Sequence, residues 1–143
     1  MSRVVLDDHL LRDVLAGEQS RQLRRLVSSS ELATTNMYYV RLCKSVVGAR
    51  GGALTGAWSA QRRRELGRRL LELPDSVLIL PMRLIGYRVA ELAESERVST
   101  LGAEAVASAE HLDAQLCVWT GDDGPGIRHA ARSAGVAYRT VST

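Results

Sequence analysis

Short apolar runs alternate with amphipathic stretches along the chain, and this pattern predicts an α/β protein. Continuous apolar segments of strand length lie at residues 4–6, 77–80 and 116–120, and a segment with Val, Tyr and Thr at 137–141 predicts a fourth strand. Apolar residues recur at helical spacing between these strands. The predicted helices cover residues 8–16, 19–27, 59–73, 82–94, 100–112 and 125–134, together with a long helix that is capped at 28–31 and ends near residue 47.

The order of these elements indicates how the chain is arranged. Strands and helices alternate through the second half, and right-handed crossovers between such strands produce a parallel sheet with helices on both faces. The expected fold is a three-layer α/β/α domain with a mostly parallel central sheet, formed by residues 1–143 as a single unit. Four glycines between residues 48 and 56 indicate a flexible connection, and Pro74 ends the helix before the second predicted strand.

Composition narrows the class of protein. Hydrophobic residues make up 45% of the 143 residues, which is enough to form a core. No segment approaches the ~18 consecutive apolar residues of a membrane helix, and no signal-peptide pattern precedes Asp7. We therefore expect a cytoplasmic protein with no membrane partner. Two cysteines, Cys43 and Cys117, are too few for a disulfide framework.

Charge is concentrated in the middle of the chain, where residues 21–70 carry eleven basic side chains against two glutamates. The predicted helix at 59–73 has an apolar face, to which we assign Leu66, Leu70, Leu71 and Leu73. Its other face is rich in arginine and is a candidate RNA-binding surface, although such a charge run is also typical of a solvated helix face. The candidate nucleic-acid-binding residues are Arg62, Arg63, Arg64 and Arg68.

Pairs of aspartates follow two of the predicted strands. Asp7 and Asp8 come after the first strand, and Asp122 and Asp123 after the third. Because sites in parallel sheets collect beyond the carboxyl ends of the strands, we expect Asp7 and Asp122 to meet there and to hold a hard cation such as Mg²⁺ or Mn²⁺. Local roles are the alternative for the other two: a helix cap for Asp8 and a turn for Asp123. The histidines share no ligand spacing and are assigned to surface or packing positions: His9, His111 and His129.

Two segments resemble PIN domains of the VapC toxin type. One is the first strand with its terminal aspartate, Val4 to Asp7. The other runs from Ala103 to Gly121 through an alanine-rich helix and a strand into a Thr-x-Asp turn, and the likeness continues through residues 130–131 and 135–136. The resemblance implies a metal-dependent ribonuclease in which acids from separate elements hold Mg²⁺ or Mn²⁺. Asp7 matches the family's first acid and Asp122 its last, with Asp123 as an alternative.

The family's two middle acids are missing. The resemblance places them near Tyr38 or Tyr39 and at Gly102. Glu104 lies two residues after Gly102, about 200° around a helix, so it does not simply replace the missing acid. Asn36 offers an amide oxygen, which is a weak ligand. Together, these positions would form a more neutral cleft that stacks a base or accepts a protein side chain, whereas core packing is the alternative for the tyrosines.

Two classes of function follow from this resemblance. We favour a PIN-like protein that acts on or binds RNA or a protein partner, with an eroded Mg²⁺ or Mn²⁺ site and weak or lost nuclease activity, because two of the four expected acids are absent. The alternative is an active metal-dependent endoribonuclease toxin of a toxin–antitoxin pair that uses Asp7 and Asp122. The resemblance also implies a homodimer and an antitoxin-like protein partner. Both classes require Asp7 and Asp122 to lie at the same edge of the sheet.

Overall fold

A parallel sheet of five strands forms the centre of the structure, a computed structural model that describes residues 2–48 and 50–143. The strand order is β3-β2-β1-β4-β5, and every pair of neighbours is parallel. The first strand is therefore central, and its carboxyl end lies between those of β2 and β4. The strands are β1 Ser2–Leu6, β2 Ser30–Thr34, β3 Val77–Ile79, β4 Gln115–Trp119 and β5 Tyr138–Val141.

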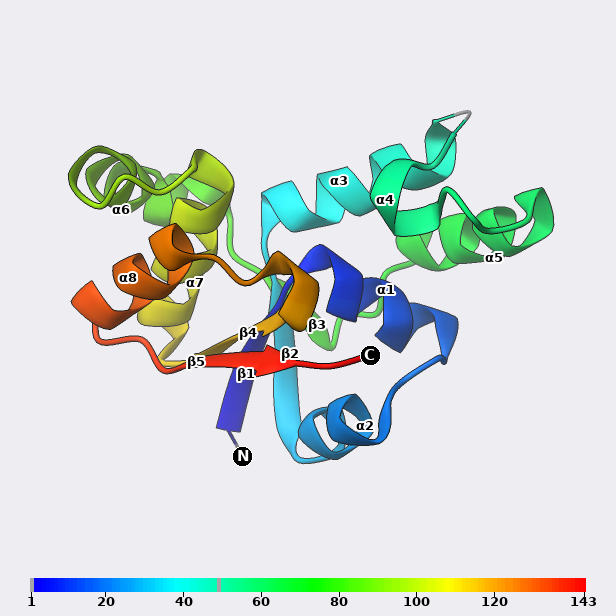
Figure 1. Cartoon of the computed structure of the whole chain (residues 1–143), viewed down its shortest axis with the longest axis horizontal. Helices are drawn as coiled ribbons and strands as arrows, with labels where there is room; N and C mark the ends of the chain where they lie inside the picture. The colour runs from blue at the N-terminus through cyan, green and yellow to red at the C-terminus, as the bar shows by residue number, and fades with distance from the viewer. Residues whose placement is uncertain (1, 49) are drawn as a thin grey trace.

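Helices cover both faces of this sheet, which confirms the expected three-layer α/β/α fold (Figure 1). Helices α6, α7 and α8 lie on one face, and α1 and α2 lie on the other. Helices α3, α4 and α5 extend beyond the sheet beside α1. The helices are α1 Asp8–Ala16, α2 Arg21–Ser28, α3 Asn36–Val47, α4 Gly52–Thr55, α5 Ala60–Leu71, α6 Met82–Ser95, α7 Thr100–Leu112 and α8 Pro125–Ser133.

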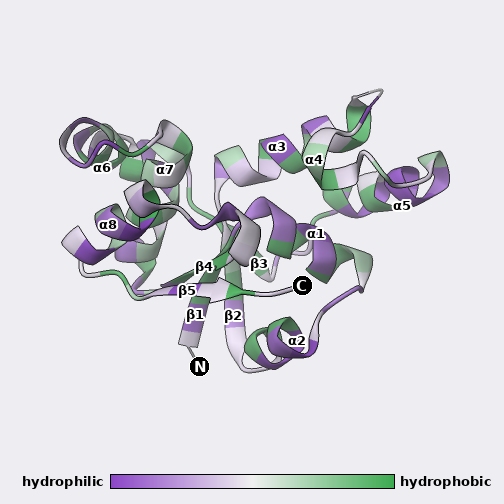
Figure 2. Cartoon of the chain, in the orientation of Figure 1, coloured by the Kyte–Doolittle hydropathy of each residue, from purple (hydrophilic) through white to green (hydrophobic). Residues whose placement is uncertain are grey.

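The central strand is buried on both sides because its neighbouring side chains point in opposite directions. Val5 packs with Leu116 and the alanines of α7 on one face, whereas Val4 and Leu6 pack with Leu10 and α2 on the other. A third apolar cluster joins α1, α3 and α5. Figure 2 shows hydrophilic residues recurring along α5, whose apolar stripe faces this third cluster.

The strand β2 was not expected, because the sequence pattern predicts the start of a long helix there. Its short segment gains pairing partners on both sides: Leu32 lies opposite Val4 of β1 and Val77 of β3. The hydroxyl of Thr34 also donates a hydrogen bond to the carbonyl of Leu6 at 2.8 Å. Helix α3 begins only after Thr35, which accepts a hydrogen bond from the amide of Tyr38 and caps the helix. Pairing with distant strands outweighs a weak local preference for helix.

Three smaller expectations are also corrected. Asp7 caps α1, not Asp8, since its side chain accepts the hydrogen bond from the amide of Leu10. Leu71 was assigned to the inward face of α5, yet it is 86% exposed. The predicted connection at 48–56 contains the short helix α4, and residue 49 lies outside the described residues. No helix in the described part of the chain is long and apolar enough to cross a membrane.

Candidate metal centre and the adjoining pocket

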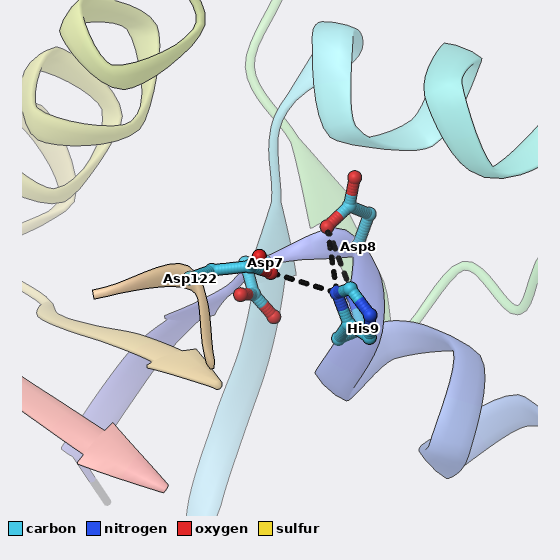
Figure 3. A group of neighbouring side chains, drawn as sticks. All are labelled: Asp7, Asp8, His9 and Asp122. Atoms are coloured by element: carbon cyan, nitrogen blue, oxygen red, sulfur yellow. Dashed lines mark hydrogen bonds and ion pairs between the residues drawn. The ribbon is translucent and has the colours of Figure 1, made fainter. Parts of the chain in front are cut away.

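Four potential ligands meet at the carboxyl ends of β1 and β4, which are neighbours in the sheet. Asp7 follows β1, Asp8 and His9 open α1, and Asp122 ends the 3₁₀ turn Thr120–Asp122 that follows β4. One ligand atom from each residue lies within 4.8 Å of the others (Figure 3). The structure thus brings Asp7 and Asp122 to the same edge of the sheet, as both functional interpretations require.

Asp7 is buried and is tied to the backbone through both carboxylate oxygens. Its Oδ1 accepts a hydrogen bond from the amide of Leu10 at 2.9 Å, and its Oδ2 accepts one from the amide of Trp119 at 2.9 Å. Burial raises the pKa of Asp7 to about 8, although these two N–H groups act to lower it. Asp7 therefore joins the end of β4 to the start of α1 while it faces the other carboxylates.

Asp8 is 1% exposed, and only one of its two carboxylate oxygens accepts a hydrogen bond from the described residues. Its Oδ1 accepts a hydrogen bond from the amide of His9 at 3.0 Å. Its Oδ2 has no hydrogen-bond partner among the described residues, and the nearest cation is Nη1 of Arg41 at 3.4 Å. A buried carboxylate oxygen without a donor is costly unless a ligand or a cation completes it. Because Arg41 pairs with this oxygen without donating a hydrogen bond to it, Asp8 keeps capacity for a further ligand.

His9 supplies a positive charge inside the cluster. Its Nδ1 lies 2.7 Å from Oδ2 of Asp122 and 3.7 Å from Oδ1 of Asp8, and its ring stacks on Trp119 with the centroids 4.2 Å apart. Burial acts to lower the pKa of His9, but the hydrogen bonds with Asp122 and Asp8 outweigh it and raise the pKa to about 9. The same hydrogen bond and charge lower the pKa of Asp122 against the opposing effect of its burial.

The sequence interpretation missed both Asp8 and His9 as members of the cluster. Asp8 was assigned a helix cap and His9 a surface or packing position. A signal was present: three consecutive residues with ligand atoms, Asp7 to His9, directly follow a buried strand. The strand end fixes the first of them, and the first turn of α1 then directs the next two toward the same space.

The structure does not bring Asp123 into the cluster. Its Oδ2 pairs with Nη2 of Arg128 at 2.7 Å, and its Oδ1 accepts a hydrogen bond from the hydroxyl of Tyr138 at 2.8 Å. Both oxygens are thus directed to α8 and β5. Of the adjacent aspartates after β4, only Asp122 lies among the potential metal ligands.

Glu104 is fully buried but serves a different purpose. Its Oε2 accepts hydrogen bonds from the backbone and side-chain N–H groups of Asn36, at 2.9 Å and 2.8 Å, and its Oε1 accepts one from the amide of Met37 at 2.9 Å. A carboxylate at the first turn of a helix is favourable because the free N–H groups point toward it. Glu104 therefore anchors the start of α3 to α7, and the Nδ2 of Asn36 also donates to the carbonyl of Leu80.

The tyrosines and Gly102 occupy three different settings. Tyr38 is buried in the main core and also borders a pocket beside the candidate metal centre. Tyr39 donates a hydrogen bond from its hydroxyl to the carbonyl of Leu70 at 2.7 Å, which joins α3 to α5. Gly102 lines the same pocket as Tyr38, and a Cβ atom there would lie 2.7 Å from Cγ2 of Val98. Core packing accounts for much of what the tyrosines do, and only Tyr38 and Gly102 border the cleft.

The pocket beside the cluster has a volume of about 290 Å³. Asp8 and Asp122 line it on one side, and Arg41 and Arg97 also face it. The rest of its wall comes from Tyr38 of α3 and from the residues around the N-terminal ends of α7 and α8. The pocket therefore offers arginines to a negatively charged ligand and carboxylates to a cation.

The arginines of α5 are partly engaged within the chain. Arg62 forms an ion pair with Glu18 and lies over the ring of Trp58 at 3.8 Å. Arg63 donates a hydrogen bond to the carbonyl of Gly48 at 3.0 Å. The other two candidates, Arg64 and Arg68, border a separate, mostly apolar groove between α3 and α5. The four arginines thus have different surroundings in the structure and do not line one common binding site.

The donor set fits a hard divalent cation. Carboxylate oxygens are the ligands that Mg²⁺ and Mn²⁺ prefer, and an ionised carboxylate keeps lone pairs free after accepting one N–H group. Asp8 and Asp122 are the best placed, since Oδ2 of Asp8 lacks a hydrogen-bond donor among the described residues and the side chain of Asp122 is 38% exposed. His9 already neutralises part of this charge, so the residues fit a weakly held cation.

No protein-family model matches the chain, and no curated protein sequence matches it either. The likeness to PIN domains therefore rests on the sequence and the structure of this chain alone. The parallel five-stranded sheet and the acidic cluster at its carboxyl edge are compatible with a PIN-like fold.

Proposed function

We propose that this chain is a PIN-like protein of the VapC type that binds RNA, or acts on it weakly, through a partly eroded Mg²⁺ or Mn²⁺ site. One observation carries the proposal: Asp7, Asp8 and Asp122 converge at one sheet edge, and a buried oxygen of Asp8 has no hydrogen-bond donor among the described residues. A bound cation would activate water and stabilise charge on a phosphodiester. An antitoxin-like protein partner and a homodimer remain parts of the proposal that rest on resemblance.

The residues divide the work at such a site. Asp8 and Asp122 would hold the cation, and Asp7 would contribute negative charge while it fixes the geometry through its two backbone hydrogen bonds. His9 stabilises the cluster in the absence of a cation and limits how tightly one is held. Because Glu104 is engaged by α3, the cluster holds three carboxylates instead of a larger set. Fewer charged ligands mean weaker binding of a hard cation, which favours low activity.

An active endoribonuclease is the second candidate, and Asp8 favours it. The resemblance left two of the four expected acids unaccounted for, and the structure adds one carboxylate from the residue that follows Asp7. Three carboxylates in reach of one another are sufficient in principle to hold one Mg²⁺ with water completing the coordination. Cleavage assays therefore decide between weak and effective catalysis.

The test is a titration of the full chain with Mn²⁺ and Mg²⁺, followed by thermal stability and by cleavage of structured and unstructured RNA. We expect millimolar Mn²⁺ to raise the Tm of the wild-type chain, and Asp8→Asn and Asp122→Asn to abolish that rise. Asp123→Asn is the matched control, since its carboxylate lies outside the cluster. Equal stabilisation of all four proteins by the metal would contradict the proposed site.

A further inference from the structure

The pocket of about 290 Å³ beside the metal centre combines opposite charges in a small space. Asp8 and Asp122 border it together with Arg41 and Arg97. Its volume lies at the lower end of the range of small-molecule sites. Its size therefore suits one small ligand, such as a single nucleotide unit.

Two arginines reach this pocket from separate elements. Arg41 is on α3 and is exposed, with its Nη1 3.4 Å from Oδ2 of Asp8. Arg97 is exposed in the loop between α6 and α7, with a φ of 52°. This left-handed conformation is common just after a helix, and Arg97 directly follows the C-cap of α6. Guanidinium groups bind phosphate through paired hydrogen bonds, so these two residues suit a phosphate group.

Another part of the wall is formed where α7 and α8 begin. Ser99 caps α7 and lines the pocket, and Gly126 and Ile127 lie in the first turn of α8. The N-terminal ends of helices carry partial positive charge, which favours an anion further. Gly126 contributes no side chain to the wall, and Ile127 offers an apolar surface that suits the face of a base.

The buried oxygen of Asp8 adds a second requirement. Oδ2 of Asp8 points toward α3, away from His9, and no hydrogen bond reaches it within the described parts of the chain (Figure 3). A carboxylate accepts hydrogen bonds and repels anions, so the part of the ligand that lies on this oxygen must carry a hydroxyl and no negative charge. The ligand must bring a negative group for the arginines and a hydroxyl for Asp8. A nucleotide carries both, as its phosphate and its sugar hydroxyls.

We propose that this pocket binds one nucleotide unit, with its phosphate on Arg41 and Arg97 and, when no cation is bound there, a sugar hydroxyl on Asp8. The inference rests on the proposed function, since it names the part of the site that positions the substrate. Arg41 and Arg97 are positioning residues in this scheme, because they hold the phosphate beside the carboxylates. The nucleotide is either free or part of a single-stranded RNA.

The experiment measures binding of adenosine 5′-monophosphate and of a short single-stranded RNA to the full chain in the presence of a chelator. Arg41→Gln and Arg97→Asn should each weaken binding about tenfold or more, since a charged hydrogen bond is lost. Asn tolerates the left-handed backbone of residue 97. Arg83→Gln is the matched control, because Arg83 is exposed and lies outside the pocket, and it should leave binding within about twofold.

A third variant, Gly126→Val, fills the pocket without removing a charge. A Cβ atom at Gly126 meets its nearest neighbour, the carbonyl oxygen of Arg97, at 3.5 Å, which is an ordinary contact. The variant should fold and should weaken nucleotide binding about tenfold, while Mn²⁺ still raises its Tm as in the wild type. Similar affinity for the mononucleotide and the RNA would identify a free nucleotide as the ligand. Tighter binding of the RNA would identify single-stranded RNA as the ligand.

The two proposals fail separately. Absence of nucleotide binding by the wild-type chain, or unchanged binding in Arg97→Asn and Gly126→Val, would overturn the nucleotide pocket even if Mn²⁺ binds at the carboxylates. Loss of nucleotide binding in these variants, without any stabilisation of the wild type by Mn²⁺, would support the pocket and count against the metal centre.

Discussion

Asp8 and Glu104 are both buried carboxylates that face α3, yet their surroundings differ completely. Glu104 is 0% exposed and accepts hydrogen bonds from three N–H groups at the start of α3. Asp8 is 1% exposed, and its Oδ2 accepts no hydrogen bond from the described residues. The first arrangement is complete in the folded chain alone. In the second, the described residues give this oxygen only the ion pair with Arg41 at 3.4 Å, which leaves it able to bind a cation or a ligand.

This difference separates structural acids from candidate functional acids better than burial does. A buried carboxylate that is saturated with N–H donors stabilises the fold and has little capacity left for a metal. A buried carboxylate with an oxygen that accepts no hydrogen bond lowers the stability of the free protein. Binding of a ligand to that oxygen restores the stability. The comparison therefore predicts a large loss of stability at Glu104 and little change at Asp8 for the same chemical change, acid to amide.

The largest expected effect is on Glu104. Glu104→Gln replaces one acceptor oxygen with an N–H donor that faces the N–H groups of α3, and it removes the charge that strengthens the remaining bonds. We expect the free energy of unfolding to fall by about 3 kcal/mol. Urea denaturation followed by circular dichroism in a chelating buffer measures this change.

Asp8→Asn is the matched comparison, because it makes the same replacement at a carboxylate with a vacant oxygen. In the chelating buffer we expect its unfolding free energy to stay within about 1 kcal/mol of the wild type, since the lost attraction to Arg41 and His9 is offset by removing a buried charge. Equal losses of stability in both variants would show that Asp8 is as much a structural acid as Glu104.

The next effect sharpens the role of His9 within the cluster. His9→Gln removes the positive charge between Asp8 and Asp122, so the carboxylates repel one another more strongly when no cation is bound. We expect a loss of about 1–2 kcal/mol in a chelating buffer, from the hydrogen bonds to charged groups. Excess Mn²⁺ should restore more stability to this variant than it adds to the wild type, because the cation then takes the place of the imidazolium.

Thermal unfolding of His9→Gln and of the wild type over a series of Mn²⁺ concentrations measures how much stability the cation adds to each protein. The control is His111→Gln on α7, since His111 is exposed and lies outside the cluster. If His9→Gln responds to Mn²⁺ less than the wild type does, then His9 is a ligand that helps to hold the cation instead of a competing charge.

The sequence predicted those parts of the fold whose signal is local. Helix α7 was expected at residues 100–112 and is found there, because it is rich in alanine and begins at the capping residue Ser99. Strand β2 was missed, because its five residues have no clear alternation and owe their conformation to pairing with β1 and β3. Short strands in the middle of a sheet depend on partners that lie far away in the sequence.

The sequence also predicted the candidate site only in part. The strand-end rule for parallel sheets correctly brought Asp7 and Asp122 together. It could not tell Asp8 from Asp7 as the helix cap, because both follow the strand and both are suitable caps. That choice depends on the direction in which the chain leaves β1, and it decides which carboxylate caps the helix and which keeps an oxygen without a hydrogen bond from the described residues.

The smallest expected effect compares the adjacent residues Asp122 and Asp123, which share a sequence environment but not a structural one. Asp123→Asn should weaken the contacts with Arg128 and Tyr138 at the surface and change the Tm only slightly, because such exposed pairs contribute little. Asp122→Asn should remove the hydrogen bond between charged groups at His9, lower the Tm further, and abolish stabilisation by Mn²⁺. Calorimetry of the two variants with and without Mn²⁺ measures both quantities. A loss of metal response in Asp123→Asn would mean that the turn after β4 rearranges when the cation binds and brings the second aspartate into the site.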